Sequence, residues 1–184
     1  MRLAPVLLVV ALGAGACADG AGTAAGGGRP LAPLVVAPPG PGWQADGPAV
    51  EVDEGNRGEV FGLGEQAEEA NAAARAAGVE ETLYRSWARG EQFAFTVVLR
   101  YRGAPAGLGD PATGALRDLA DLPDGLTGSC LRTAGDGSAF ETCTVSAPDD
   151  RLDVQVSVVG PDGPDVPQAA EAWARAAAER LTAR

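Results

Sequence analysis

The chain has 184 residues, and its 25 acidic and 14 basic side chains give a formal net charge of −11. All the basic residues are arginine and histidine is absent, which excludes Ser-His-Asp and Cys-His catalysis, imidazole metal ligands and lysine Schiff bases. A chain this acidic also lacks the positive surface that nucleic acid requires, so we expect no nucleic-acid partner.

A signal peptide is predicted for residues 1–16. Arg2 precedes an apolar run from Leu3 to Leu12, and small residues follow, which is the layout of a cleavable export signal. The apolar run is too short to span a bilayer as a helix. The segment Ala14-Gly15-Ala16-Cys17 resembles the lipobox of bacterial lipoproteins. More loosely, the whole layout resembles uncharacterised actinobacterial secreted lipoproteins.

This resemblance implies that the signal peptide is cut before Cys17 and that its thiol carries a lipid anchor with acyl chains such as palmitate. The mature protein would then sit on the outer face of the cell membrane, with the lipid bilayer as its partner. Cys17 is the odd cysteine of three, which agrees with a role apart from the other two. Ala14 and Ala16 also satisfy the ordinary signal-peptidase rule, so a soluble secreted product is the alternative.

Residues 17–48 are rich in Ala, Gly and Pro, and this composition predicts a tether that cannot bury a core. Within it, Leu34-Val35-Val36 could add a short edge strand. Residues 49–184 have the length of one domain with a single core.

The first half of this domain is predicted to contain four strands and one helix. The strands cover 49–53, 59–61, 81–88 and 92–102, and the last two flank an Arg89-Gly90 turn. The helix covers 65–77, and Gly78 follows it where a left-handed residue ends a helix. In the strand over 92–102, every second residue from Phe93 to Tyr101 is apolar, which predicts a central strand.

In the second half, Asp110 and Pro111 predict the start of a helix that ends near Leu122. Three strands follow, over 127–134, 138–146 and 152–160, and a helix over 167–182 with Asp165 as its cap ends the chain. This order predicts an α+β domain, an antiparallel sheet with helices packed on one face. A doubly wound parallel sheet is the alternative, but too many strands are adjacent in the chain.

The cysteines predict a cross-strand disulfide. Asp136-Gly137 favours a two-residue hairpin turn, and pairing outward from it places Cys130 opposite Cys143 in a non-hydrogen-bonded pair, where side chains are closest. Closing this loop contributes about 3 kcal/mol to stability, and such bonds persist in exported proteins. A redox or thiolate metal site is the alternative, but the sequence has no C-x-x-C motif.

Five residues in and beside the 81–102 hairpin suggest a binding site for an anionic ligand. A positive patch beside an aromatic ring suits such a ligand, and the residues are Arg85, Trp87, Arg89, Arg100 and Arg102. The alternative is that Trp87 belongs to the core and that the arginines pair with neighbouring acids. The length of the turn decides which face Trp87 occupies.

Two further motifs favour ordinary structure over a site. Gly62-x-Gly64-x-x-Ala67 has the spacing of a dinucleotide-binding turn, but the preceding strand is short and no acid ends the next one. Two groups of aspartates lack calcium-loop spacing and read as solvated surface, namely Asp118, Asp121 and Asp124, and Asp149, Asp150 and Asp153. We therefore expect no catalytic residue, no metal and no cofactor.

These observations predict a non-catalytic module that binds a ligand or a partner at the cell envelope. A structural or accessory envelope protein without a small-molecule pocket is the alternative. A hydrolase that uses two carboxylates is a more distant one, because nothing in the sequence singles out the pair.

Overall fold

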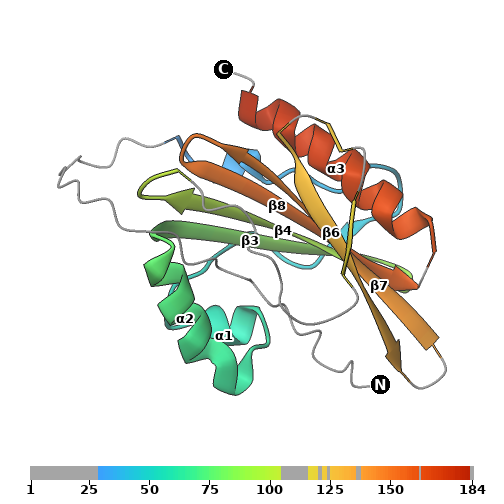
Figure 1. Cartoon of the computed structure of the whole chain (residues 1–184), viewed down its shortest axis with the longest axis horizontal. Coiled ribbons are helices and arrows are strands. Elements are labelled where there is room, and N and C mark those ends of the chain that lie inside the picture. The colour runs from blue at the N-terminus through green and yellow to red at the C-terminus, as the bar shows by residue number, and fades with distance from the viewer. Residues whose placement is uncertain are drawn as a thin grey trace.

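One antiparallel sheet forms the centre of a computed structural model that describes residues 29–104, 116–119, 122–123, 125–135, 138–161 and 163–182 (Figure 1). The strand order is β1-β3-β4-β8-β7-β6-β5, and β2 also pairs with β3. The strands are β1 Gln44–Ala45, β2 Val50–Glu51, β3 Val79–Arg89, β4 Gln92–Tyr101, β5 Leu116–Asp118, β6 Thr127–Gly135, β7 Ser138–Asp149 and β8 Leu152–Pro161. The helices are α1 Arg57–Val60, α2 Ala67–Ala76 and α3 Asp165–Thr182, with short 3-10 turns at Ala32–Leu34 and Gly64–Gln66. The predicted α+β class is confirmed.

Strand β4 is central, as its alternating pattern predicted, and it lies between β3 and β8. Phe95 and Val97 are buried on one of its faces, and Ala94 and Val98 are fully buried on the other. The hydroxyl of Thr96 is also buried, and it donates a hydrogen bond to the carbonyl of Gln155, 3.1 Å away. A strand covered on both faces requires packing elements on each side of the sheet.

The predicted meander and its disulfide are confirmed. Strand β6 pairs with β7 so that Cys130 faces Cys143 and Arg132 faces Glu141, and the two sulfurs are bonded at 2.02 Å. Both cysteines are buried in the cluster that contains Val145. The disulfide therefore joins two strands beneath the main core, while the turn at 136–137 lies outside the described residues.

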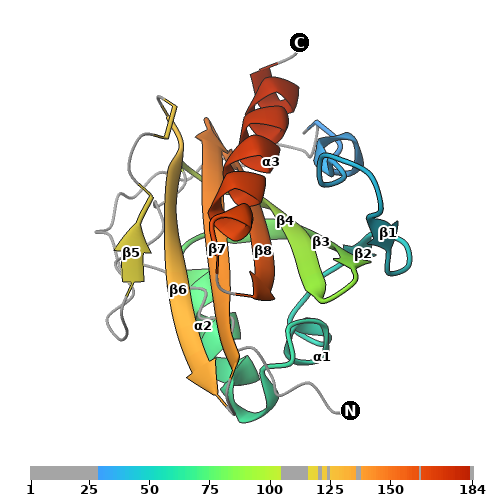
Figure 2. The same ribbon diagram turned by 90° about the vertical axis from the view of Figure 1, so that its right-hand side faces the viewer.

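Helix α3 covers one face of the meander strands (Figure 2). It begins at Asp165, two residues before the predicted start, and it ends at Thr182 as expected. Trp173 is its largest buried side chain, and the other buried side chains on this face are small or aliphatic. Its packing partners on the sheet are fully or almost fully buried valines, Val145, Val154, Val156 and Val158.

A second, smaller cluster covers the opposite face of β4. Phe95, Val97, Leu99 and Tyr101 form its buried part. Helices α1 and α2 lie on this side of the sheet, away from α3 (Figure 1), and Phe61 after α1 meets Tyr84 of β3 edge to face at 5.4 Å. Helices thus contribute to both faces of the sheet, with α3 supplying the main cover.

Two predicted elements are wrong. Residues 59–61 form no strand: Glu59 and Val60 end helix α1, and Phe61 follows it. The Asp53 carboxylate accepts hydrogen bonds from the backbone of Gly55 and Asn56 and turns the chain before this helix. The predicted helix over 110–122 is wrong at Leu116–Asp118, which form β5 and pair with β6. Pairing there satisfies the backbone groups of an edge that would otherwise be open. Asp110 and Pro111 lie outside the described residues.

Residues 29–43, which we call the strap, are folded against the domain. Leu34 is fully buried in the main core, and the indole nitrogen of Trp173 donates to the carbonyl of Val36 at 2.9 Å. The guanidinium of Arg29 donates to the carbonyls of Arg180 and Leu181, both at 2.8 Å. The predicted tether of residues 17–48 is therefore wrong over the strap, where a 3-10 turn replaces the edge strand considered at 34–36. Residues 1–28, with Cys17, lie outside the described residues.

The strap makes a testable contribution to stability. Replacing Leu34 with Ala should lower the free energy of unfolding by about 2–4 kcal/mol, because it leaves a cavity in a filled core. Urea denaturation of the two proteins measures the change, and Val50→Ala, at a residue 38% exposed, is the control. An unchanged midpoint for Leu34→Ala would show that the strap behaves as the tether the composition suggested.

Candidate functional site

The β3–β4 turn decides where the predicted ligand residues lie. Arg89 pairs with Gln92, so the turn consists of two residues, Gly90 and Glu91, and Gly90 has the positive φ of 58° that such a turn requires. This register pairs Trp87 with Ala94, on the α3 side of the sheet. The turn length that the sequence left open is therefore settled.

Trp87 is a core residue. Only 3% of its surface is exposed, and its ring meets that of Trp173 edge to face at 5.3 Å. The guanidinium of Arg85 lies 5.5 Å from the Trp87 ring centre. The indole thus serves as a platform for Arg85 and has little surface of its own to offer a ligand.

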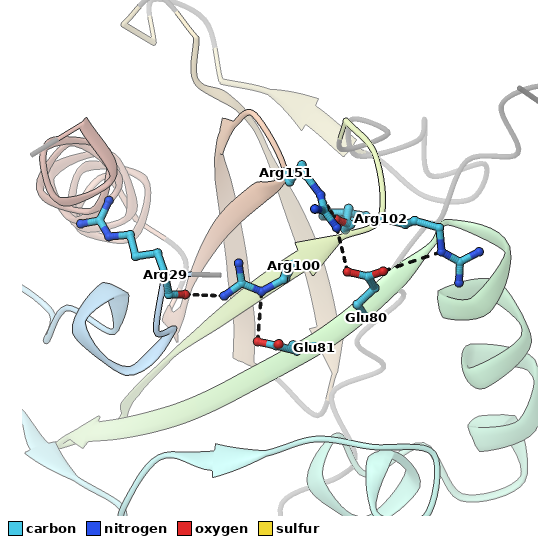
Figure 3. Close-up of polar contacts among 7 residues, drawn as sticks. Arg29, Glu80, Glu81, Arg100, Arg102 and Arg151 are labelled. Carbon is cyan, nitrogen blue, oxygen red and sulfur yellow. Dashed lines mark hydrogen bonds and ion pairs between the residues drawn. The ribbon is translucent and has the colours of Figure 1, made fainter. Parts of the chain in front are cut away.

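Arg100 and Arg102 are paired with acids, as the alternative interpretation expected (Figure 3). Arg100 donates to Glu81 at 3.1 Å and also to the carbonyl of Arg29. Arg102 lies 3.7 Å from the Glu80 carboxylate, which also forms an ion pair with Arg151 at 2.8 Å. These ion pairs neutralise part of the positive charge that the sequence suggested for a ligand.

Arg89 is held by neutral groups. Its guanidinium donates twice to the side-chain oxygen of Gln92, at 3.0 and 2.6 Å, and lies 4.4 Å from the ring centre of Trp43. Gly40 and Gly42 both have positive φ and lie against the Arg89 side chain, where a Cβ on either would be in ordinary contact with it. The Gly-Pro-Gly end of the strap therefore encloses this arginine.

Arg85 differs from these three arginines. Within the described part of the chain its guanidinium has no ion-pair or hydrogen-bond partner, and its Nε is buried without one. The side chain is partly exposed and rests on the Trp87 ring. A guanidinium presents its donors in a planar fork that matches a carboxylate, phosphate or sulfate. Of the five predicted site residues, Arg85 is the one with a buried donor that has no acceptor among the described residues.

Asp153 is a buried acid that the sequence interpretation missed. It is 2% exposed, and its two oxygens accept hydrogen bonds from the Ser146 hydroxyl at 2.6 Å and the Gln155 amide at 2.9 Å. Burial raises the pKa of its carboxyl group, and the two hydrogen bonds oppose that shift. Tyr101 lies near this carboxylate and is itself buried, and burial raises the pKa of its phenol.

The residue pattern along β8 does not indicate a buried acid. Asp153, Gln155 and Ser157 alternate with valines along β8, a pattern typical of one core face and one solvated face. The register places Asp153 beside Leu99 of the second cluster, so the polar face is covered as well. The expectation of solvated surface is wrong for Asp153 and correct for Asp149 and Asp150, which are exposed.

The remaining motifs form no site in the described residues. A dinucleotide-binding turn needs a strand before its glycines. Helix α1 stands there instead, before Gly62 and Gly64. Asp118 is exposed, and Asp121 and Asp124 lie outside the described residues. Cys130, Glu141 and Cys143 place possible metal-binding atoms within 4.8 Å of one another. The disulfide, however, uses both sulfurs.

Asp153 predicts a characteristic dependence of stability on pH. Its folded-state pKa is raised, so the cost of burying the charged form is present in full above that pKa and disappears as the pH falls towards the unfolded value of 3.8. Asp153→Asn should therefore be more stable than the native protein at pH 7, with the difference shrinking on acidification. Urea denaturation between pH 7 and pH 4 measures it, with exposed Asp149→Asn as the control. A constant difference would show that charge burial is not its cause.

Comparisons with known proteins give one structural likeness. No protein-family model matches the chain, and no curated protein matches it significantly. A crystal structure of an uncharacterised protein from Mycobacterium smegmatis, an ortholog of Rv0999, is similar with a TM-score of 0.40 and 13% identity, over 78% of this chain and 91% of the other. Among the described residues, none of the helices has the length and apolar character to cross a membrane.

Proposed function

We propose that this chain is an extracytoplasmic lipoprotein, held at the outer face of the cell membrane by acyl chains on Cys17. The signal-peptide layout and the lipobox-like Ala14-Gly15-Ala16-Cys17 support the anchor. The Cys130–Cys143 disulfide supports it as well, because it uses the other two cysteines and suits an oxidising compartment. Cys17 is then the one cysteine left for a lipid.

The function of the domain, in this proposal, is to bind an anionic ligand or partner group without catalysis. The observation that carries it is the Arg85 guanidinium, which has no carboxylate partner among the described residues although the chain holds 25 acids. A buried polar atom without a partner is unusual and calls for an explanation. Among the described residues, Arg85 Nε shares this state with Thr82 Oγ1, but only the arginine is charged. A carboxylate, phosphate or sulfate would supply the missing acceptor.

The two alternatives have less support. An accessory protein that docks through an apolar surface needs a contiguous patch, but the large apolar side chains exposed in the described residues, Val50 and Phe140, lie on the separate strands β2 and β7. A hydrolase of the two-carboxylate kind needs a second acid across a substrate. Asp153 has both oxygens bonded to Ser146 and Gln155 instead.

The anchor has a direct test. The membrane fraction of the producing bacterium should contain a mature chain that begins at Cys17 and is heavier than its sequence by a diacylglyceryl group. Mass spectrometry of the N-terminal peptide measures this, and Cys17→Ser should appear in the soluble fraction. A native chain that is cut elsewhere, or that has an unmodified Cys17, would be the secreted soluble protein of the alternative.

The proposed ligand site predicts that anion binding and the stabilisation it gives depend on Arg85. Titration with inorganic phosphate or succinate should shift the Arg85 Nε–Hε resonance and raise the melting temperature, since a probe at ten times its Kd stabilises by about 1.4 kcal/mol. Arg85→Gln should remove the stabilisation, whereas Arg175→Gln, at an arginine ion-paired with Glu171 on α3, should retain it. Sodium chloride at equal ionic strength controls for screening. Equal stabilisation of both variants would refute the site.

A further inference from the structure

The structure fixes the point at which the chain from Cys17 enters the domain. Arg29, the first described residue, donates to the carbonyls of Arg180 and Leu181 at the C-terminal end of α3. Its own carbonyl accepts a hydrogen bond from Arg100 near the end of β4. Arg29 is therefore tied to two elements, at the end of the domain where they meet.

Several charged side chains surround this point, and Figure 3 shows how they lie across β3, β4 and the β7–β8 turn. We call this region the anchor end and define it by six residues, Arg29, Glu80, Glu81, Arg100, Arg102 and Arg151. The β3–β4 turn at Gly90 and Glu91 lies at the other end of the same strands. The domain thus has one end at the proposed tether and one remote from it.

The chain between the proposed lipid and Arg29 is short. Eleven residues, 18–28, separate Cys17 from Arg29. Twelve peptide steps span at most about 42 Å, and a coil of that length spans about 20 Å on average. A folded domain of about 150 residues has a radius of gyration of about 15 Å and is about 40 Å across. The remote end could reach the bilayer only with the connecting chain almost fully extended.

The charge at the anchor end differs from that of the whole protein. Removal of residues 1–16 takes away only Arg2, so the mature chain carries −12. The anchor end holds four arginines and two glutamates, and the exposed Asp149 and Asp150 of the adjacent turn bring it close to neutral. An anionic surface repels this end less than the rest of an acidic protein.

Two of the arginines have donors to spare. Arg102 is 80% exposed and lies 3.7 Å from Glu80. Arg151 is 43% exposed and binds the same glutamate, and its Nε donates to the carbonyl of Tyr101 at 2.8 Å, which leaves its remaining donors free in the described part of the chain. One carboxylate cannot fully engage two guanidinium groups, and exposed ion pairs of this kind contribute little to stability. Exchanging one of them for a phosphate, which a guanidinium binds through two parallel hydrogen bonds, would therefore cost the domain little.

We propose that the anchor end faces the bilayer and that Arg102 and Arg151 contact the phosphates of its lipid headgroups. This orientation rests on the proposed lipidation of Cys17. In this orientation the β3–β4 turn points away from the bilayer. Arg85 pairs with Thr96, four residues along β3 from Glu81, and so lies about 13 Å from the anchor end. The anionic-ligand site would thus stay clear of the membrane.

The test uses the mature lipidated chain in phosphatidylcholine vesicles that contain phosphatidylglycerol and lipids with a nitroxide quencher at the headgroup. A fluorophore is attached through Gly103→Cys at the anchor end or through Glu91→Cys at the remote end, both at exposed residues. Quenching should be at least several-fold stronger at residue 103. Equal quenching, or stronger quenching at residue 91, would overturn the orientation.

The arginine contacts have a separate readout. With phosphatidylglycerol present, quenching at residue 103 should exceed that in phosphatidylcholine alone. The double variant Arg102→Gln and Arg151→Gln should lose most of this excess, because each arginine at such a surface contributes about fivefold in binding. Arg175→Gln, on the exposed side of α3, is the matched control. Equal loss in both variants would overturn the phosphate contacts.

The same samples separate this inference from the proposed function. Their mass is measured before reconstitution. An unmodified Cys17 would overturn the anchor and, with it, the orientation. A lipidated Cys17 with quenching at the remote end would leave the anchor in place and overturn the orientation alone.

Discussion

Helix α3 can lie close to the sheet because the residues on its inner face are small. Ala170, Ala174 and Ala177 are fully buried against the valine face of β7 and β8, and Gly160 lets the start of the helix approach, since a Cβ there would sit 3.1 Å from Val166. Larger side chains would separate the layers and leave cavities. The disulfide, the meander and Trp173 all depend on this close contact, because they share one core.

The strap completes that core and joins it to the N-terminal part of the chain. The last carbonyls of a helix have no partner within the helix, and at the end of α3 the Arg29 guanidinium supplies one. A positive charge also suits the C-terminal end of the helix dipole. A segment rich in Ala, Gly and Pro thus became part of the fold through a few residues, Leu31 and Leu34 in the core and Arg29 at the helix end.

Charge is distributed unevenly in this acidic protein. Acids at the surface pair two arginines in and beside the β3–β4 hairpin, because Glu81 binds Arg100 and Glu80 binds Arg102. Arg85 is partly exposed and rests on the buried Trp87 ring, where the described residues bring no acid to it. Asp153 is buried on the opposite face with only neutral donors, Ser146 and Gln155. Neither the unpaired cation nor the uncompensated acid lowers the free energy of the fold, so both stand out from the rest of the structure.

The sequence alone determined the strands with strict alternation, the hairpin register that pairs Cys130 with Cys143, and the C-terminal helix, because turn chemistry and periodicity are local properties. It did not determine the strap, the edge strand β5 or the burial of Asp153. Each of these depends on a segment that is distant in the sequence. Helix α3 packs with Leu34 in one core, β6 pairs with Leu116–Asp118, and Leu99 lies beside Asp153. Which arginine kept its donors free was likewise decided by the tertiary structure, because an ion pair requires two side chains to meet and sequence distance does not show whether they do.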